Sequence, residues 1–245
     1  MSSKSHQISD LISIIGYEYN TFFQYLETSS GMFENNTLNV KREIEEITLR
    51  LAKLSEKIDG DLDSYLNADY DALNSDLFLN EIELNAYREM KTMFANSSFV
   101  FLVTIFEGAL KRLCETVIDL NKVQPKHIKE SSYTMQGKIF LSKVIGIKLP
   151  DESLWARLRQ YLELRNMIVH NNATAEKHPG KKIDSQPSGY KNIYSFKGLN
   201  ISEYEEGARF YIEDLEFIRE FGGFSNDIIA QIGAKLEEYV RITHP

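Results

Sequence analysis

Three polar side chains of the kinds that handle phosphate and protons lie within one six-residue stretch, Arg165 to His170. A guanidinium donates in a fork to phosphate oxygens, and an imidazole exchanges protons near neutral pH. Asn166 and His170 are four residues apart, so on a helix they share one face. Side chains of these types at this spacing could bind and cleave a phosphodiester.

The element that must position them is a helix predicted from about Asp151 to His170. Asp151 and Glu152 suit the positive end of a helix dipole, and Asn171 favours the helix end. Leu154, Leu158 and Tyr161 form the apolar stripe of this helix. The next position at this spacing, where an apolar residue is expected, is occupied by Arg165. A permanent charge in an apolar stripe costs stability unless something satisfies it.

Glu107 is a second charge within an apolar stripe, in a helix predicted through the apolar segment 99–106 and on to Val117. It has the sign that would satisfy Arg165. Two interpretations stay open. The pair is a structural salt bridge, with His170 no more than a helix cap, or Glu107 also fixes the geometry of a catalytic arginine or histidine.

The charge distribution favours an anionic partner around this stretch, although the chain as a whole carries a net charge of −8. Between Lys122 and Lys197 there are 14 Lys and Arg against six Asp and Glu, a balance of +8. The remaining residues hold 14 against 30, a balance of −16. A positive field on an acidic body attracts polyanions. Such a block can equally be a solvated face.

A loop of about 20 residues is predicted directly after the stretch, from Asn171 to Tyr190. Its prolines, glycines and lysines are typical of irregular chain, and loops of this length are either functional or disordered. Its lysines, Lys177, Lys181 and Lys182, are candidates for a flap that contacts substrate.

The fold class predicted is all-α, an up-and-down helical bundle with room for one small β-hairpin formed by 191–196 and 209–212. Residues 1–92 are predicted as an N-terminal helical extension and 93–245 as the bundle. The extension should hold two helices with a break at Gly31–Asn36. The second has a heptad seam, predicted either to pack on the first helix or to form a dimer seam: Val40, Ile44, Ile47, Leu51, Leu54 and Ile58. Further helices are expected at about 75–117, 136–144 and 213–242.

Several function classes are disfavoured. The single cysteine, Cys114, excludes an internal disulfide and a thiolate-rich metal site. The histidines lack partners at ligand spacing, and phosphate-loop, dinucleotide and serine-hydrolase motifs are absent, so no metal and no cofactor is expected. The N-terminus does not look like a signal peptide. We find no apolar segment of about 18 residues, the length that can span a membrane. A cytoplasmic protein without a membrane span is expected.

The motif Arg165-Asn166-x3-His170-Asn171 resembles the R-x(4–6)-H signature of the HEPN superfamily (higher eukaryotes and prokaryotes nucleotide-binding domains). The order of elements agrees as well: an apolar helix with an internal glutamate, a connector, the motif helix, a loop and a long closing helix. The resemblance covers about residues 93–245.

The resemblance implies a homodimer in which two motifs face each other across a two-fold axis and build a composite site. Many members are metal-independent endoribonucleases of toxin–antitoxin or antiviral systems, so RNA and an antitoxin or other regulatory protein are the implied partners. Arg165 and His170 would be catalytic, with Asn166 as polar helper and Glu107 and Asn171 in support. The three loop lysines would bind RNA.

A different class of function is the alternative. The chain could keep a HEPN-like scaffold, bind a partner protein or a nucleotide, and cleave nothing. An Arg165 buried against Glu107, away from any cleft, would favour this alternative. A basic cleft shared by Arg165 and His170 would favour the nuclease.

Overall fold

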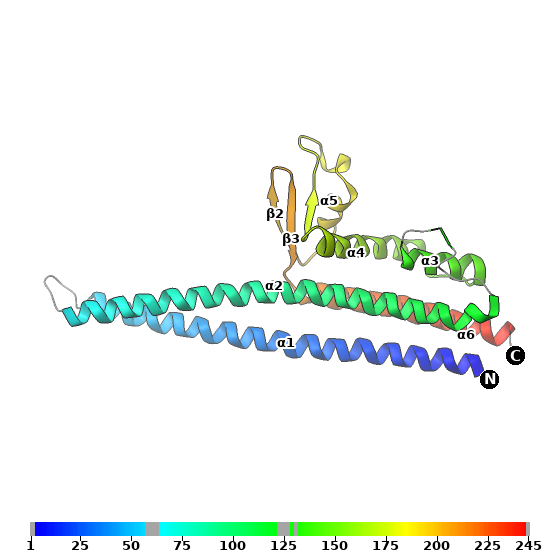
Figure 1. Cartoon of the computed structure of the whole chain (residues 1–245), viewed down its shortest axis with the longest axis horizontal. Coiled ribbons are helices and arrows are strands. Elements are labelled where there is room, and N and C mark those ends of the chain that lie inside the picture. The colour runs from blue at the N-terminus through cyan, green and yellow to red at the C-terminus, as the bar shows by residue number, and fades with distance from the viewer. Residues whose placement is uncertain (1–2, 57–63, 122–127, 130–131, 244–245) are drawn as a thin grey trace. The chain divides into compact units, whose positions relative to one another are not determined.

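The computed structural model describes residues 3–56, 64–121, 128–129 and 132–243. Six α-helices and three strands follow one another in these residues (Figure 1). Their bounds are α1 Ser3–Ser55, α2 Ser64–Asn121, α3 Tyr133–Ile139, α4 Glu152–His170, β1 Thr174–Glu176, α5 Ser188–Ile193, β2 Leu199–Tyr204, β3 Gly207–Ile212 and α6 Leu215–Thr243. A π-helical turn, Phe140–Ile145, extends α3, and a 3₁₀ turn spans Ile183–Ser185. The fold is mostly helical, as predicted, but it is not all-α, because it also contains a three-stranded sheet.

The chain divides into two compact units, one made of residues 1–24 and 95–245 and the other of residues 25–94. We call them the head and the hairpin. All of the candidate site residues lie in the head.

The hairpin pairs the second part of α1 with the first part of α2. A stripe of less exposed positions runs along α2 at 70, 73, 77, 80, 84, 87, 91 and 94, with alternating steps of three and four as in a coiled coil. Positions 74 and 92 are also less exposed and lie next to this stripe. The seam predicted on the second helix supplies the partner side, from buried Val40 to half-buried Leu54; Ile58 lies outside the described residues. The seam therefore packs on α2, and the prediction that it packs on the first helix is wrong.

The predicted break at Gly31–Asn36 is also wrong, because α1 runs through it without interruption. A glycine in a helix interior costs only about 1 kcal/mol. Aromatic contacts outweigh that cost here, since the rings of Phe33 and Tyr25 lie 5.4 and 6.0 Å from the ring of Phe94.

The core of the head is built by the apolar faces of four helices: the start of α1, the end of α2, α4 and α6. Phe99 of α2 lies at its centre, with its ring 5.3 Å from those of Phe217 and Phe221 on α6 and 6.3 Å from that of Tyr161 on α4. Phe99 and Phe221 are fully buried. The predicted α4 stripe is therefore the face that contacts this core.

Two features hold α1 against α6 in the head. Gly222 has no side chain where Phe23 approaches, and a Cβ at this position would overlap the Phe23 ring. Beside it, the buried Tyr19 hydroxyl donates to Ser225 Oγ at 3.0 Å. Burial raises the pKa of Tyr19 well above its usual value, so the phenol keeps its proton.

The three strands form one antiparallel sheet in the order β1-β3-β2. The sheet packs on the helices through the buried side chains of β3, Ala208, Phe210 and Ile212. The Ile212 amide also donates to Asn96 Oδ1 of α2 at 3.1 Å. A hairpin was predicted with 191–196 as one strand, and that placement is wrong, since the strand is 199–204 and residues 188–193 form α5.

One helix in the described part of the chain, α2, contains an 18-residue window long and apolar enough to cross a membrane. The expectation that no such segment exists is corrected on this point. The finding is weak evidence for a membrane span, because a core helix of a soluble protein passes the same test, and 44% of this window is buried inside the protein.

Candidate functional site

Helix α4 positions the Arg165–His170 stretch within the bounds that the sequence predicts. Asp151 precedes the helix and its Oδ1 accepts from the Ser153 amide at 3.4 Å. Asn171 is the C-terminal cap, with its amide donating to the Met167 carbonyl at 3.0 Å. The predicted helix is therefore confirmed at both ends.

The chain leaves α4 by a sharp corner. Asn172 and Ala173 both have positive φ, 50° and 55°. In a residue other than glycine this conformation costs about 1–2 kcal/mol. The corner is held by the Ala173 amide, which donates to the Met167 carbonyl at 2.9 Å, and by the Ala173 carbonyl, which accepts from the Phe210 amide at 2.9 Å. Strand β3 thereby fixes the end of α4 that carries His170.

Arg165 is paired with Glu107, as the sequence predicts. Its Nη2 donates to Glu107 Oε2 at 2.7 Å, joining α4 to α2. The other carboxylate oxygen, Oε1, accepts from the hydroxyl of fully buried Thr134 at 3.3 Å. Glu107 is thus held from two sides, and it holds the arginine in turn.

The pair uses only part of the Arg165 guanidinium. No other described residue accepts a hydrogen bond from its Nη1 or Nε, and 23% of the side chain is exposed. A guanidinium has five N–H donors. Arg165 is therefore anchored through one nitrogen and keeps further donors for a ligand.

Asn166 and His170 are both exposed, and their spacing puts them on one face of α4. Asn171 is exposed too, and its carbonyl accepts from the Thr174 amide at 3.0 Å. Arg165 lies on another side of the helix, because five residues are almost one and a half turns. No hydrogen bond among the described residues joins Arg165 to His170, so a single chain does not bring the two predicted catalytic groups together.

The loop that carries the three lysines has more structure than predicted. It contains β1, the 3₁₀ turn and the start of α5, and Figure 1 shows it at the end of the sheet remote from α4. Gln186 organises it: its Nε2 donates to the carbonyls of His178 and Lys181 at 3.0 and 2.8 Å, and its Oε1 accepts from the His178 amide at 2.6 Å. The interpretation as plain disorder is therefore wrong.

The lysines of this loop differ in what they can do. Lys181 and Lys182 are exposed, whereas the Lys177 ammonium lies 3.7 Å from a Glu203 oxygen. Lys177 and Lys181 line a pocket of about 370 Å³ together with Tyr190, Tyr194 and Gln186. Figure 1 places this loop and α4 at different ends of the sheet, and no hydrogen bond among the described residues joins any of the three lysines to His170.

Tyr194 and Glu203 form a coupled pair in this pocket. Burial, with the Glu203 hydrogen bond in support, raises the pKa of Tyr194 far above its usual value. The same hydrogen bond lowers the pKa of the Glu203 carboxyl. Tyr194 is therefore a neutral hydrogen-bond donor at physiological pH, not a base.

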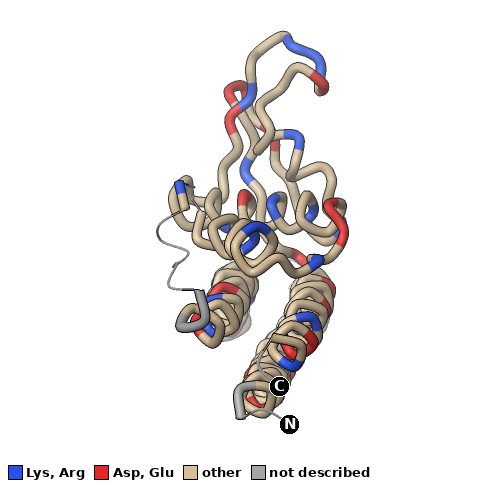
Figure 2. Tube along the Cα trace, turned by 90° about the vertical axis from the view of Figure 1, so that its right-hand side faces the viewer, with Lys and Arg blue, Asp and Glu red and all other residues tan. Residues whose placement is uncertain are grey.

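The structure shows a second pocket that no sequence motif indicated. It lies between α3 and α4, has a volume of about 500 Å³, and is lined by Ser132, Met135, Lys138, Ile139, Ser142, Lys143, Glu152 and Arg159. We call it the α3–α4 pocket. Figure 2 marks the Lys and Arg positions of the chain in blue and its Asp and Glu positions in red, and both colours recur along the helices. Lys138 and Lys143 come from α3 and the π-helical turn that extends it, and the fold places Arg159 of α4 opposite them.

Among the described residues, no group of three or more His, Cys, Asp or Glu side chains is placed to hold a metal ion.

No family model matches the chain, and neither does any curated protein or solved structure. The HEPN assignment and the roles that it implies therefore stay predictions.

Proposed function

We propose that the head is a metal-independent endoribonuclease whose site is built from Arg165, His170 and Asn166. The observation that carries the proposal is the geometry of Arg165: Glu107 fixes one guanidinium nitrogen, and the remaining donors have no acceptor among the described residues. Fixed cationic donors suit the charge that builds up on phosphate during cleavage, and the exposed His170 of a second copy would supply the proton transfer.

The reaction proposed is attack of the RNA 2′-hydroxyl on its own 3′-phosphate. An imidazole of His170 takes the 2′ proton, the 2′-oxygen bonds to phosphorus, and the bond from phosphorus to the 5′-oxygen breaks. The leaving 5′-oxygen receives a proton from a second imidazole. The products are a 2′,3′-cyclic phosphate and a 5′-hydroxyl, and DNA is not a substrate because it lacks the nucleophile.

A homodimer would supply the second imidazole. Each chain has one histidine in the motif, so a site holding two imidazoles, one as acid and one as base, needs two copies of the motif. Two copies could also bring Arg165 of one chain near His170 of the other, which lie on different sides of α4 within one chain. The corner after Asn171, pinned to β3, would keep the exposed His170 at the end of α4 where a second copy can approach. An antitoxin or regulatory protein would act by covering this surface.

The proposal is tested by incubating the purified protein with RNA in excess chelator, beside a strand of the same sequence with 2′-deoxyribose. We expect the wild type to cleave the RNA strand and not the 2′-deoxyribose strand. The His170→Ala protein should not cleave RNA. The His6→Ala protein, changed at an exposed histidine of α1, is the matched control and should cleave RNA like the wild type. Cleavage of both strands, or equal activity of the His170→Ala protein, would show that this site does not do the chemistry.

A second candidate function is favoured by the Arg165–Glu107 pair itself. An ion pair three-quarters buried between α2 and α4 is also what a purely structural bridge looks like. In this case the head would be a helical module that binds a partner protein or a nucleotide. It would predict that His170→Ala changes nothing and that Arg165→Ala changes only stability.

A further inference from the structure

The α3–α4 pocket is suited to an anion with an apolar portion. Three cationic side chains, from Lys138, Lys143 and Arg159, face one carboxylate, that of Glu152. Met135 and Ile139 add apolar wall. The lining therefore has an excess of positive charge beside an apolar surface, which matches a phosphate joined to a nucleoside.

Two of the three cations have no acidic partner in the described part of the chain. Lys143 and Arg159 are exposed, and neither is paired with a carboxylate among the described residues. The Arg159 Nε is directed to the Met135 sulfur at 3.4 Å, a weak acceptor, so both terminal nitrogens of its fork stay available.

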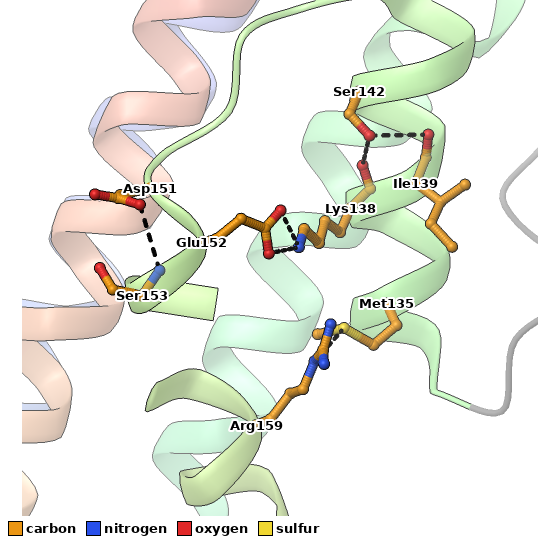
Figure 3. A network of polar contacts seen from close by, with 8 residues as sticks. All are labelled: Met135, Lys138, Ile139, Ser142, Asp151, Glu152, Ser153 and Arg159. Carbon is orange, nitrogen blue, oxygen red and sulfur yellow. Dashed lines mark hydrogen bonds and ion pairs between the residues drawn. The ribbon is translucent and has the colours of Figure 1, made fainter. Parts of the chain in front are cut away.

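The third cation is held in place. Lys138 has a side chain only 12% exposed, and its ammonium lies 2.7 and 2.8 Å from the two Glu152 oxygens and 5.3 Å from the centre of the Trp155 ring. Figure 3 shows Lys138 reaching from α3 to Glu152, with Arg159 two turns further along α4 beside Met135. Glu152 is 80% exposed, so it can turn outwards and leave Lys138 to an entering anion.

The pocket is aligned with the predicted catalytic face. Arg159, Asn166 and His170 follow one another at steps of seven and four residues, which places all three on one side of α4, and all three are exposed. From Arg159 to His170 the helix rises about 16 Å. A short RNA strand lying along this face would reach from the pocket to His170.

We propose that the α3–α4 pocket binds a backbone phosphate of the RNA strand whose cleavage is assigned to His170. This inference rests on the proposed function for the identity of the strand. The phosphate would be held by Arg159, Lys143 and Lys138, and Glu152 would be displaced from Lys138 when the strand enters. The pocket acts as a substrate subsite a few nucleotides from the bond that is cut.

The test measures binding and cleavage separately. Binding uses a strand of about ten nucleotides with 2′-deoxyribose, which cannot be cleaved through the proposed reaction, and it is repeated over a range of salt concentrations. The variants are Arg159→Ala, Lys143→Ala, Glu152→Gln and His170→Ala. Lys235→Ala on α6, an exposed lysine paired with Glu238, is the matched control.

We expect Arg159→Ala and Lys143→Ala each to weaken binding about tenfold, as for loss of a charge-assisted hydrogen bond. Each should lower the slope of log K against log salt by about 0.7, the value for one phosphate contact on a single strand. Glu152→Gln should tighten binding roughly two- to fivefold, since it removes the carboxylate that competes for Lys138. The control should match the wild type. Circular dichroism and thermal unfolding confirm that each variant is folded.

Binding by Arg159→Ala and Lys143→Ala that equals the wild type would overturn the subsite. So would equally tight, Arg159-dependent binding of adenosine monophosphate alone, which would make the pocket a site for a free nucleotide. The proposed nuclease fails separately: if no protein cleaves RNA but the pocket variants lose binding as expected, the subsite stands. If the wild type cleaves RNA and the pocket variants bind and cleave like it, the nuclease stands and the subsite fails.

Discussion

Two arginine–carboxylate pairs of the head differ in how much of the guanidinium they use. Arg112 donates from both terminal nitrogens to both oxygens of Glu18, at 2.7 and 2.5 Å. Arg165 donates from one nitrogen to one oxygen of Glu107, whose second oxygen is taken by Thr134. Both arginines join two helices far apart in the sequence.

The difference separates a structural bridge from a candidate binding site. Both terminal nitrogens of Arg112 donate to Glu18, and its Nε is buried with no hydrogen-bond partner among the described residues. Few donors of Arg112 therefore remain accessible to a ligand. The hydrogen bond between the partners raises the pKa of Arg112 and lowers the pKa of Glu18. Arg165 is oriented by its carboxylate and still has donors to offer.

The largest expected contrast is in RNA cleavage. Arg165→Ala should lower the cleavage rate about 100-fold or more, as when a donor to transition-state charge is removed. Arg112→Ala should leave the cleavage rate within about twofold of the wild type, because a partly exposed ion pair contributes little energy and this one is not part of the proposed site. Rates are measured under conditions where circular dichroism shows both variants folded. Equal losses in the two variants would mean that the contrast in their geometry has no functional meaning.

A smaller effect is expected when the anchor of Arg165 is weakened. Glu107→Gln keeps an oxygen that can accept from Arg165 but removes the charge, so we expect the cleavage rate to fall about tenfold. Glu18→Gln, the matched change at the other pair, should leave the rate unchanged. A Glu107→Gln protein with the full rate would indicate that Glu107 does not position the arginine.

For stability the expected order is reversed: Arg112→Ala should destabilise the protein more than Arg165→Ala. Arg112→Ala should lower the free energy of unfolding by about 1 kcal/mol, and the melting temperature by about 2–4 °C. The estimate is modest because both partners are 35% exposed and water screens them. Urea unfolding of Arg112→Ala and Arg165→Ala measures the contrast. A greater loss in Arg165→Ala would favour a purely structural role for its pair.

The contribution of Glu18 should depend on pH. Because its pKa is lowered in the folded protein, its stabilising effect is complete above the pKa of glutamate in the unfolded chain, about 4.3. It is lost as the pH falls through the lower pKa of the folded state. The difference in unfolding free energy between wild type and Glu18→Gln should therefore shrink on acidification below about pH 4. A difference independent of pH would contradict this origin.

The smallest effect concerns the corner after His170, which has no counterpart near Arg112. Ala173 has a φ of 55°, which glycine adopts without strain. Ala173→Gly should therefore raise the free energy of unfolding by about 0.5 kcal/mol, the relief of strain less the added entropy of glycine in the unfolded chain. Thermal unfolding measures the change. Gly146→Ala, at a φ of 81° in an open position, should destabilise by a similar amount and serves as the reverse control.

The parts of this picture that helical spacing encodes could be predicted from the sequence. The bounds of α4 follow from Asp151 and Asn171, and the pair between Arg165 and Glu107 follows from two opposite charges in two apolar stripes. Each of these features can be recognised from a short stretch of sequence, because a charged residue stands out at a position of the stripe where an apolar residue is expected.

Other parts depend on contacts between distant segments. Nothing near Gly31 shows that α2 will pair with α1 and carry the helix through it, and nothing in 199–204 marks it as a strand more clearly than 191–196. The α3–α4 pocket could not be predicted, because Lys143 and Arg159 are ordinary surface residues until α3 is placed beside α4. Gln186 likewise gains its role only when the loop folds around it.

The chemical nature of the RNA ends tests the central claim most directly. The 3′ ends of RNA fragments produced by the wild-type protein in excess chelator would be analysed by mass spectrometry, with Arg165→Ala and Arg112→Ala treated in parallel. The account predicts 2′,3′-cyclic phosphates from the wild type and from Arg112→Ala, and at least about 100-fold slower formation of them by Arg165→Ala. Fragments that end in a 3′-hydroxyl, or RNA left intact by the wild type, would contradict cleavage by the 2′-hydroxyl at this site.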